Sequence, residues 1–124
     1  MWSRFADLNA IPRPSKKEEQ AIAFMKAFGE GLRLDTQVDE AGNVIIKKPA
    51  SPGMEDRATV VMQGHLDMVC QKNEDTEFDF ETQGIEMYVD GDWVKARGTT
   101  LGADNGIGVA TAMAVLASDD IEHP

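Results

Sequence analysis

The 124-residue sequence is poor in cysteine, in basic residues and in long apolar runs. Its single cysteine, Cys70, cannot form an internal disulfide, which favours a reducing, cytoplasmic setting. The formal net charge of -10 argues against a nucleic-acid-binding protein, because such a protein needs a basic face to contact phosphates. No apolar run has the length of a signal peptide or a membrane span, so the sequence predicts no membrane association.

Apolar residues are nevertheless abundant, at 42% of the chain, which is ample for the core of one modest domain. An apolar face predicts a short helix over residues 2–8, and the two prolines that follow end it. Ser15 and Glu18 have the spacing of a capping box. Apolar residues at helical spacing after it predict a second helix, which ends at two closely spaced glycines, Gly29 and Gly31.

Strand patterns follow in three places. Residues 32–38 alternate between apolar and polar side chains, and residues 44–47 form the predicted return strand of a hairpin. The turn at residues 90–92 predicts a second hairpin. Between the hairpins, Thr59–Met62 is a continuous, β-branched apolar run, which is typical of a central strand covered on both faces. Helices and strands in this order indicate an α/β layered domain.

His65, one of only two histidines, follows this predicted central strand. Ligands collect at the carboxyl ends of strands in open α/β sheets. Asp67 would point to the same side as His65 if the backbone is extended, and could accept a hydrogen bond from the second ring nitrogen of a metal-binding histidine. A hydrogen-bonded structural histidine is the alternative. The apolar neighbours of Cys70 favour a neutral, packed thiol over a metal ligand.

Asp104 lies in a glycine-rich run, residues 98–108, that leads into an apolar helix. It could be the N-cap of this helix, or a carboxylate that bridges two divalent metal ions about 3.5–4 Å apart. The glycines would let the backbone approach another group closely. A dinucleotide fingerprint nearly matches, but Thr111 replaces its last small residue. His65 and Asp104 are too few ligands for zinc by themselves, and His123 is not counted among them.

Longer stretches of the sequence resemble one enzyme family. Gln63–Val69 and Gly91–Gly108 resemble the bacterial aminoacyl-histidine dipeptidases, which are also called Xaa-His or cytosolic beta-alanyl-histidine (carnosinase-like) dipeptidases. These enzymes are a branch of the dizinc exopeptidases. Ile11–Ser15, Gly42–Val44 and Lys47–Ala50 agree with the same family. The resemblance covers essentially the whole chain.

This resemblance implies a role for each candidate residue. His65 matches a zinc ligand, and Asp104 matches the carboxylate that bridges both zinc ions. Asp67 matches the catalytic aspartate that orients the histidine. The peptide between Asp104 and Asn105 is expected to be cis. The implied cofactor is a pair of divalent metal ions, zinc above all, and the implied substrate is a small peptide of the Xaa-His type.

The implied fold is an α/β/α sandwich with a mixed central sheet. Residues 1–124 match the N-terminal part of this catalytic domain, without its downstream Glu-Glu pair, which supplies a general base and a zinc ligand, and without the second domain. We therefore expect the 124 residues alone to be inactive and to bind zinc weakly. Apolar surface left bare favours self-association into a homo-oligomer. Another peptidase or an aminoacylase of the same superfamily, or a non-catalytic binding domain, are the alternatives.

Overall fold

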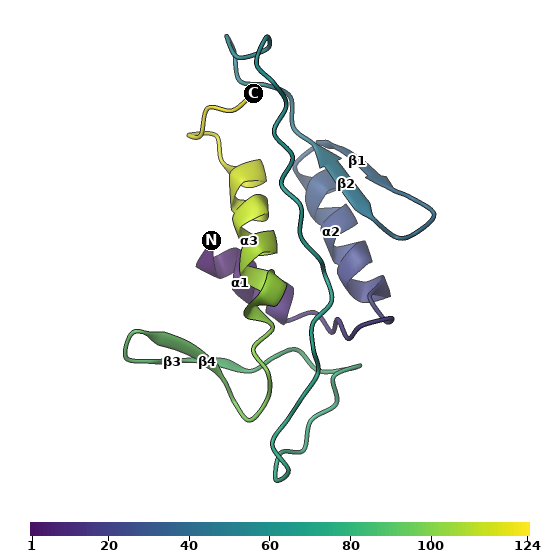
Figure 1. The fold of residues 1–124 in the computed structure, drawn as a ribbon, viewed down its shortest axis with the longest axis vertical. Helices are drawn as coiled ribbons and strands as arrows, with labels where there is room; N and C mark the ends of the chain where they lie inside the picture. Colours follow the sequence, from purple (N-terminus) through teal and green to yellow (C-terminus); the bar gives the residue numbers. More distant parts are fainter.

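The computed structural model describes residues 1–124 as three helices and two β-hairpins (Figure 1). In chain order the elements are α1 (Trp2–Asn9), α2 (Glu19–Gly31), β1 (Asp35–Val38), β2 (Val44–Lys47), β3 (Met87–Asp90), β4 (Trp93–Ala96) and α3 (Ala103–Ala117). Helix α1 packs against α3, and α2 packs against the β1–β2 hairpin. None of these helices is both long and apolar enough to cross a membrane.

A small core joins the three helices. It contains Leu8 from α1, Met25 from α2, and Val109 and Met113 from α3. Partly buried side chains surround these four, namely Phe24, Phe28, Val44, Ile46 and Leu66. Because Leu66 directly follows His65, its packing against this core fixes one end of the segment that carries the candidate site.

The predictions that rest on local patterns are confirmed for α1, for the end of α2 and for both hairpins. Strand β1 pairs antiparallel with β2, and β3 pairs antiparallel with β4. Strand β1 begins at Asp35, three residues later than predicted, because the preceding residues close the last turn of α2. The backbone N–H of Leu32 donates to the carbonyl of Phe28, and that of Leu34 donates to the carbonyl of Gly29.

The predicted capping box at Ser15 is wrong. Helix α2 begins only at Glu19, and Lys16 has a left-handed backbone with φ of 69°. The Glu18 carboxylate accepts a hydrogen bond from the Lys16 N–H at 2.6 Å, within a turn that precedes the helix. The Ser15 hydroxyl donates instead to the carboxylate of Asp67. A partner 52 residues away has therefore replaced the local one.

The predicted central strand at Thr59–Met62 is also wrong for these 124 residues. The segment runs extended past α3 in Figure 1, but residues 59–65 make no backbone–backbone hydrogen bond. A strand needs a hydrogen-bonded neighbour, and the four strands present pair only within their own hairpins. No mixed central sheet forms among residues 1–124, and Val61 is 83% exposed instead of covered on both faces.

Candidate metal centre

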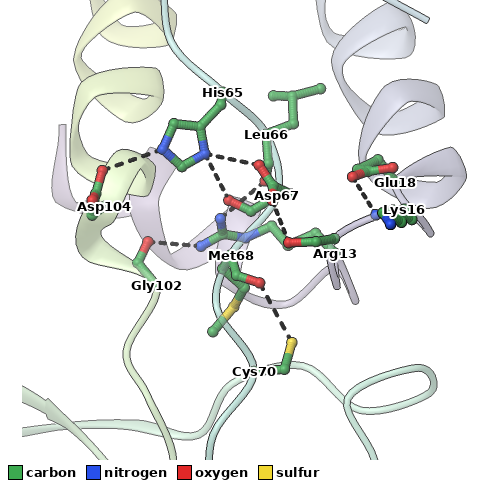
Figure 2. Close-up of polar contacts among 11 residues, drawn as sticks. Arg13, Lys16, Glu18, His65, Leu66, Asp67, Met68, Cys70, Gly102 and Asp104 are labelled. Carbon is green, nitrogen blue, oxygen red and sulfur yellow. Dashed lines mark hydrogen bonds and ion pairs between the residues drawn. The ribbon is translucent and has the colours of Figure 1, made fainter.

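Three side chains meet where the extended segment reaches the start of α3. In Figure 2, His65 lies between the carboxylates of Asp67 and Asp104. Its Nδ1 is 2.9 Å from Asp67 Oδ1, and its Nε2 is 3.2 Å from Asp104 Oδ1. The structure thus brings together the three residues that the sequence singled out, although Asp104 is 39 positions from His65 in the chain.

Asp67 is held by two donors and in turn orients the imidazole. The Ser15 hydroxyl bonds Oδ2, and His65 Nδ1 bonds Oδ1. The Ser15 hydrogen bond, followed by that of His65, lowers the pKa of Asp67 below its usual value despite partial burial. An ionised Asp67 keeps the proton on Nδ1, so that Nε2 becomes the nitrogen available to a metal ion.

His65 holds its own proton more firmly than an ordinary histidine. Burial alone would lower the pKa of His65, but the hydrogen bonds with Asp104 and Asp67 outweigh burial and raise it. A metal ion at Nε2 would have to displace this proton, because only a neutral imidazole binds a metal. Metal binding at this place is therefore expected to weaken as the pH falls through the pKa of His65.

Asp104 is not the N-cap that its position suggested. The first turn of α3 is interrupted at Asp104 and Asn105, whose backbone angles are not helical, and the peptide between them is cis, as the resemblance implied. No side-chain hydrogen bond caps the helix. The Asp104 carboxylate is instead turned toward His65 and its side chain remains 98% exposed. Its other carboxylate oxygen makes no hydrogen bond within the chain.

The donor atoms fit one part of a zinc site. Two tetrahedral zinc ligands, each about 2.0–2.1 Å from the ion, stand about 3.3 Å apart, close to the 3.2 Å between His65 Nε2 and Asp104 Oδ1. An imidazole nitrogen and a carboxylate oxygen are also ordinary zinc donors. However, nowhere in residues 1–124 do three or more His, Cys, Asp or Glu side chains gather closely enough to hold a metal ion. The residues present therefore fit part of a metal site.

Sequence reasoning gave no role to Arg13, which is buried directly behind this centre with 1% of its surface exposed. Its guanidinium bonds backbone carbonyls in both segments that carry candidate ligands. Burial lowers the pKa of Arg13, opposed by the nearby Asp67 and Cys70. The only signal in the sequence was the match of Ile11–Ser15 to the resembled family, which indicated no particular function for the arginine.

The remaining candidates lie outside the centre. Burial raises the pKa of the Cys70 thiol, which stays protonated at neutral pH and points to the carbonyl of Met68. His123 bonds Ser51 through its backbone N–H. The glycine run approaches the chain's own side chains, since a Cβ on Gly102 would lie 2.5 Å from Arg13 Nη2. This close packing accounts for the glycine there without a bound nucleotide.

Two similar proteins are both named as dipeptidases. The chain is 51% identical over 123 residues to the cytosol non-specific dipeptidase of Escherichia coli (strain K12), a match that covers 99% of this chain and 25% of that protein. The crystal structure of aminoacylhistidine dipeptidase from Vibrio alginolyticus superposes with a TM-score of 0.96 at 52% identity, over 98% of this chain and 25% of that one. No protein-family model matches the chain.

A crystal structure of a tripeptidase from Staphylococcus aureus superposes with a TM-score of 0.75 at 22% identity, over 93% of this chain and 30% of that one, which shows a shared fold alone. The chain therefore has a fold found in solved peptidases. The more specific resemblance, to the dipeptidases, is confirmed in both sequence and structure. The chain spans about a quarter of the length of the dipeptidases it matches.

Proposed function

We propose that the protein carrying this sequence is a metal-dependent dipeptidase whose resident ions are zinc. The observation that supports this best is the 3.2 Å approach of His65 Nε2 to Asp104 Oδ1, with Asp67 bonded to the other ring nitrogen. Both relatives with about half of their matched residues identical are named as dipeptidases, which favours peptide-bond hydrolysis.

Each residue has a distinct task in this proposal. His65 would hold a metal ion through Nε2, and Asp104 would hold metal through its exposed carboxylate. Asp67 keeps the proton of His65 on Nδ1 and makes the imidazole a better ligand. A bound metal pair would supply Lewis-acid chemistry, namely polarisation of the peptide carbonyl and a water whose pKa lies at about 7.

We also propose that residues 1–124 form the N-terminal part of a catalytic domain with an α/β/α sandwich fold. Thr59–Met62 would become a strand of its mixed central sheet once other strands lie beside it. The proposed substrate is a dipeptide. A dipeptide of the Xaa-His type is the first candidate, because the matched crystal structure is named as an aminoacylhistidine dipeptidase. The name of the cytosolic relative and the single cysteine support a cytoplasmic location.

The test is hydrolysis by the complete natural protein with and without metal. We expect a strong chelator to abolish hydrolysis of an Xaa-His dipeptide and zinc to restore it. His65→Ala and Asp104→Ala should each lower kcat/KM by more than about 100-fold, while Asp67→Asn should cost about 10–100-fold, the usual effect of losing a group that orients a ligand. His123→Ala is the matched histidine control and should leave activity unchanged.

A substrate panel separates this proposal from its rivals. A tripeptide and an N-acyl amino acid, offered beside the dipeptide, distinguish a tripeptidase or an aminoacylase from a dipeptidase. Metal-independent hydrolysis, or full activity in both alanine variants, would show that this centre is not the catalytic site. A complete protein that hydrolyses none of the three substrates would favour the non-catalytic binding domain.

The 124 residues on their own should behave differently. With only His65 and Asp104 as ligands they lack the three protein groups that zinc normally needs, and we propose weak zinc binding and no appreciable hydrolysis. Hydrolysis of an Xaa-His dipeptide by this polypeptide, purified free of other peptidases, would contradict the proposal. We also infer that the polypeptide self-associates through Thr59–Met62, the apolar segment that no other strand covers.

A further inference from the structure

Arg13 uses its guanidinium to join parts of the chain that are distant in sequence. Its Nη1 donates to the carbonyl oxygen of Leu66 at 3.0 Å, and its Nη2 donates to that of Gly102 at 2.9 Å and to Asn9 Oδ1 at 2.6 Å. Figure 2 shows the side chain reaching from its own loop, below His65 in this view, to the carbonyl of Gly102. Arg13 therefore contacts α1, the extended segment and the loop before α3 at once.

The two carbonyls belong to the two segments that present the candidate ligands. Leu66 lies between His65 and Asp67, while Gly102 comes two residues before Asp104. The backbone carbonyl of Arg13 also accepts the Met68 N–H at 3.1 Å, which anchors the far side of Asp67. A guanidinium is planar and rigid, so the spacing of its two terminal nitrogens restricts how far these segments can move apart.

Fold stability alone does not explain a buried arginine at this position. The guanidinium bonds only neutral oxygens, and its Nε is buried without a partner. A buried charge loses hydration, and apolar residues of similar volume often replace buried ionic groups with no loss of stability. What an apolar residue cannot do is to donate hydrogen bonds to both carbonyls and so fix their separation.

The glycines next to Asp104 make room for this arrangement. Gly102 has φ of +70°, and a Cβ there would lie 2.5 Å from Arg13 Nη2. A Cβ on Gly106 would lie 3.0 Å from the same nitrogen and 2.7 Å from Cε2 of Phe5. Two glycines four residues apart thus leave space for one guanidinium group.

We propose that Arg13 is a positioning residue, which sets the separation between His65 and Asp104 and thereby the affinity of the centre for a divalent metal ion. The proposal rests on the metal-dependent function proposed above. Arg13 acts only through the backbone of the ligand segments and is buried away from any substrate.

The test compares three variants of the complete natural protein. Arg13→Met removes both carbonyl bonds, and Arg13→Lys keeps the charge but cannot span the two carbonyls with one ammonium group. Ile46→Ala is the matched control, because it loosens the packing of β2 on α2 without touching either carbonyl. Zinc affinity is measured by chelator competition below the unfolding temperature, and thermal unfolding is followed for the metal-free proteins.

We expect Arg13→Met to weaken zinc binding about 10–100-fold, as is usual when a group behind a metal ligand is lost. Arg13→Lys should bind zinc with intermediate affinity. Ile46→Ala should bind zinc like the parent protein, even if its unfolding temperature falls as much as that of Arg13→Met. A folded Arg13→Met variant with affinity within twofold of the parent would overturn the proposal. So would an Ile46→Ala variant that loses zinc affinity equally.

A second measurement tests the positioning role without zinc, and so separately from the proposed function. It also replaces the zinc measurement if Arg13→Met does not fold. The ¹⁵N signals of the His65 ring, recorded without metal, report its hydrogen bonds to Asp67 and Asp104. Arg13→Lys should shift or broaden these signals, and Arg97→Met, at an exposed arginine, should not. Unchanged signals overturn the positioning role. If the parent binds no zinc, the metal function fails, while these spectra still decide whether Arg13 positions His65.

Discussion

The Ser15 hydroxyl begins a line of hydrogen bonds that continues through the Asp67 carboxylate and the His65 imidazole to Asp104. Each bond restricts the group after it, because Asp67 has one oxygen for each donor. Ser15 also contributes the largest lowering of the pKa of Asp67. A single hydroxyl therefore helps to orient the group that selects the tautomer of His65 and stabilises its ionised form.

Replacing Ser15 by alanine should raise the pKa of Asp67 toward its ordinary value, because the donor to Oδ2 is lost. A folded-state pKa below the unfolded one adds stability at neutral pH, which is lost as the pH falls through the folded-state pKa. The metal-free parent should therefore unfold at a higher temperature than Ser15→Ala at pH 7, and this difference should shrink near about pH 2, below ordinary aspartate pKa values.

Thermal unfolding across this pH range measures the effect, and NMR titration of the Asp67 carboxyl carbon measures its pKa directly. Ser3→Ala, at an exposed serine of α1, is the matched control and should change neither. A difference between the parent and Ser15→Ala that stays constant with pH would show that the hydroxyl does not act through the charge of Asp67.

At the scale of elements, the loop before α3 depends on glycine for two separable reasons. Gly102 combines a positive φ with a close approach to Arg13 and to the Met68 sulfur. Gly53 has a φ of +86° with nothing near its missing Cβ, whereas Gly106 is crowded without a positive φ. Gly31, at the end of α2, has neither constraint.

Gly102→Ala should consequently destabilise the protein more than Gly53→Ala, which has the positive φ without the crowding. A left-handed backbone costs a residue with a Cβ roughly 1–2 kcal/mol, and displacing the Arg13 guanidinium adds the loss of its hydrogen bonds. Gly53→Ala should show the backbone cost alone, and Gly31→Ala should be neutral or stabilising by up to about 1 kcal/mol. Urea unfolding of the four proteins gives the comparison, and equal losses at Gly102 and Gly53 would exclude a contribution from crowding.

The elements that could be predicted from the sequence are those whose cause is local. Helix α1 and both hairpins follow from periodicity and turn residues, and the neighbours His65 and Asp67 follow from two-residue spacing. Ser15 could not be placed, because its partner Asp67 is distant in sequence and a capping box is an equally good use of serine. The glycine run indicated a close approach but not what approaches, since Arg13 lies in another loop.

For the molecule as a whole, the amount of exposed surface is the main anomaly. The accessible surface of 8279 Å² exceeds by about 1,700 Å² the roughly 6,600 Å² expected for a compact monomer of 13.6 kDa. A standard protein interface buries about 800 Å² per partner, so the excess is large enough for extensive further packing. Thr59–Met62 contributes to this surface, and its strand character could not be judged from sequence because a strand depends on its neighbour.

The uncovered segment gives a prediction for the 124-residue polypeptide studied alone. An extended apolar segment with unpaired backbone groups on both edges is a template for pairing with another chain, so we expect sedimentation velocity to show association that grows with concentration. Val61→Lys should shift the distribution toward monomer, because a charge on a free edge opposes pairing. Val89→Lys is the control, since Val89 is 75% exposed but lies on β3, which already pairs with β4. A polypeptide that stays monomeric at all concentrations, or associates equally in both variants, would show that Thr59–Met62 does not drive self-association.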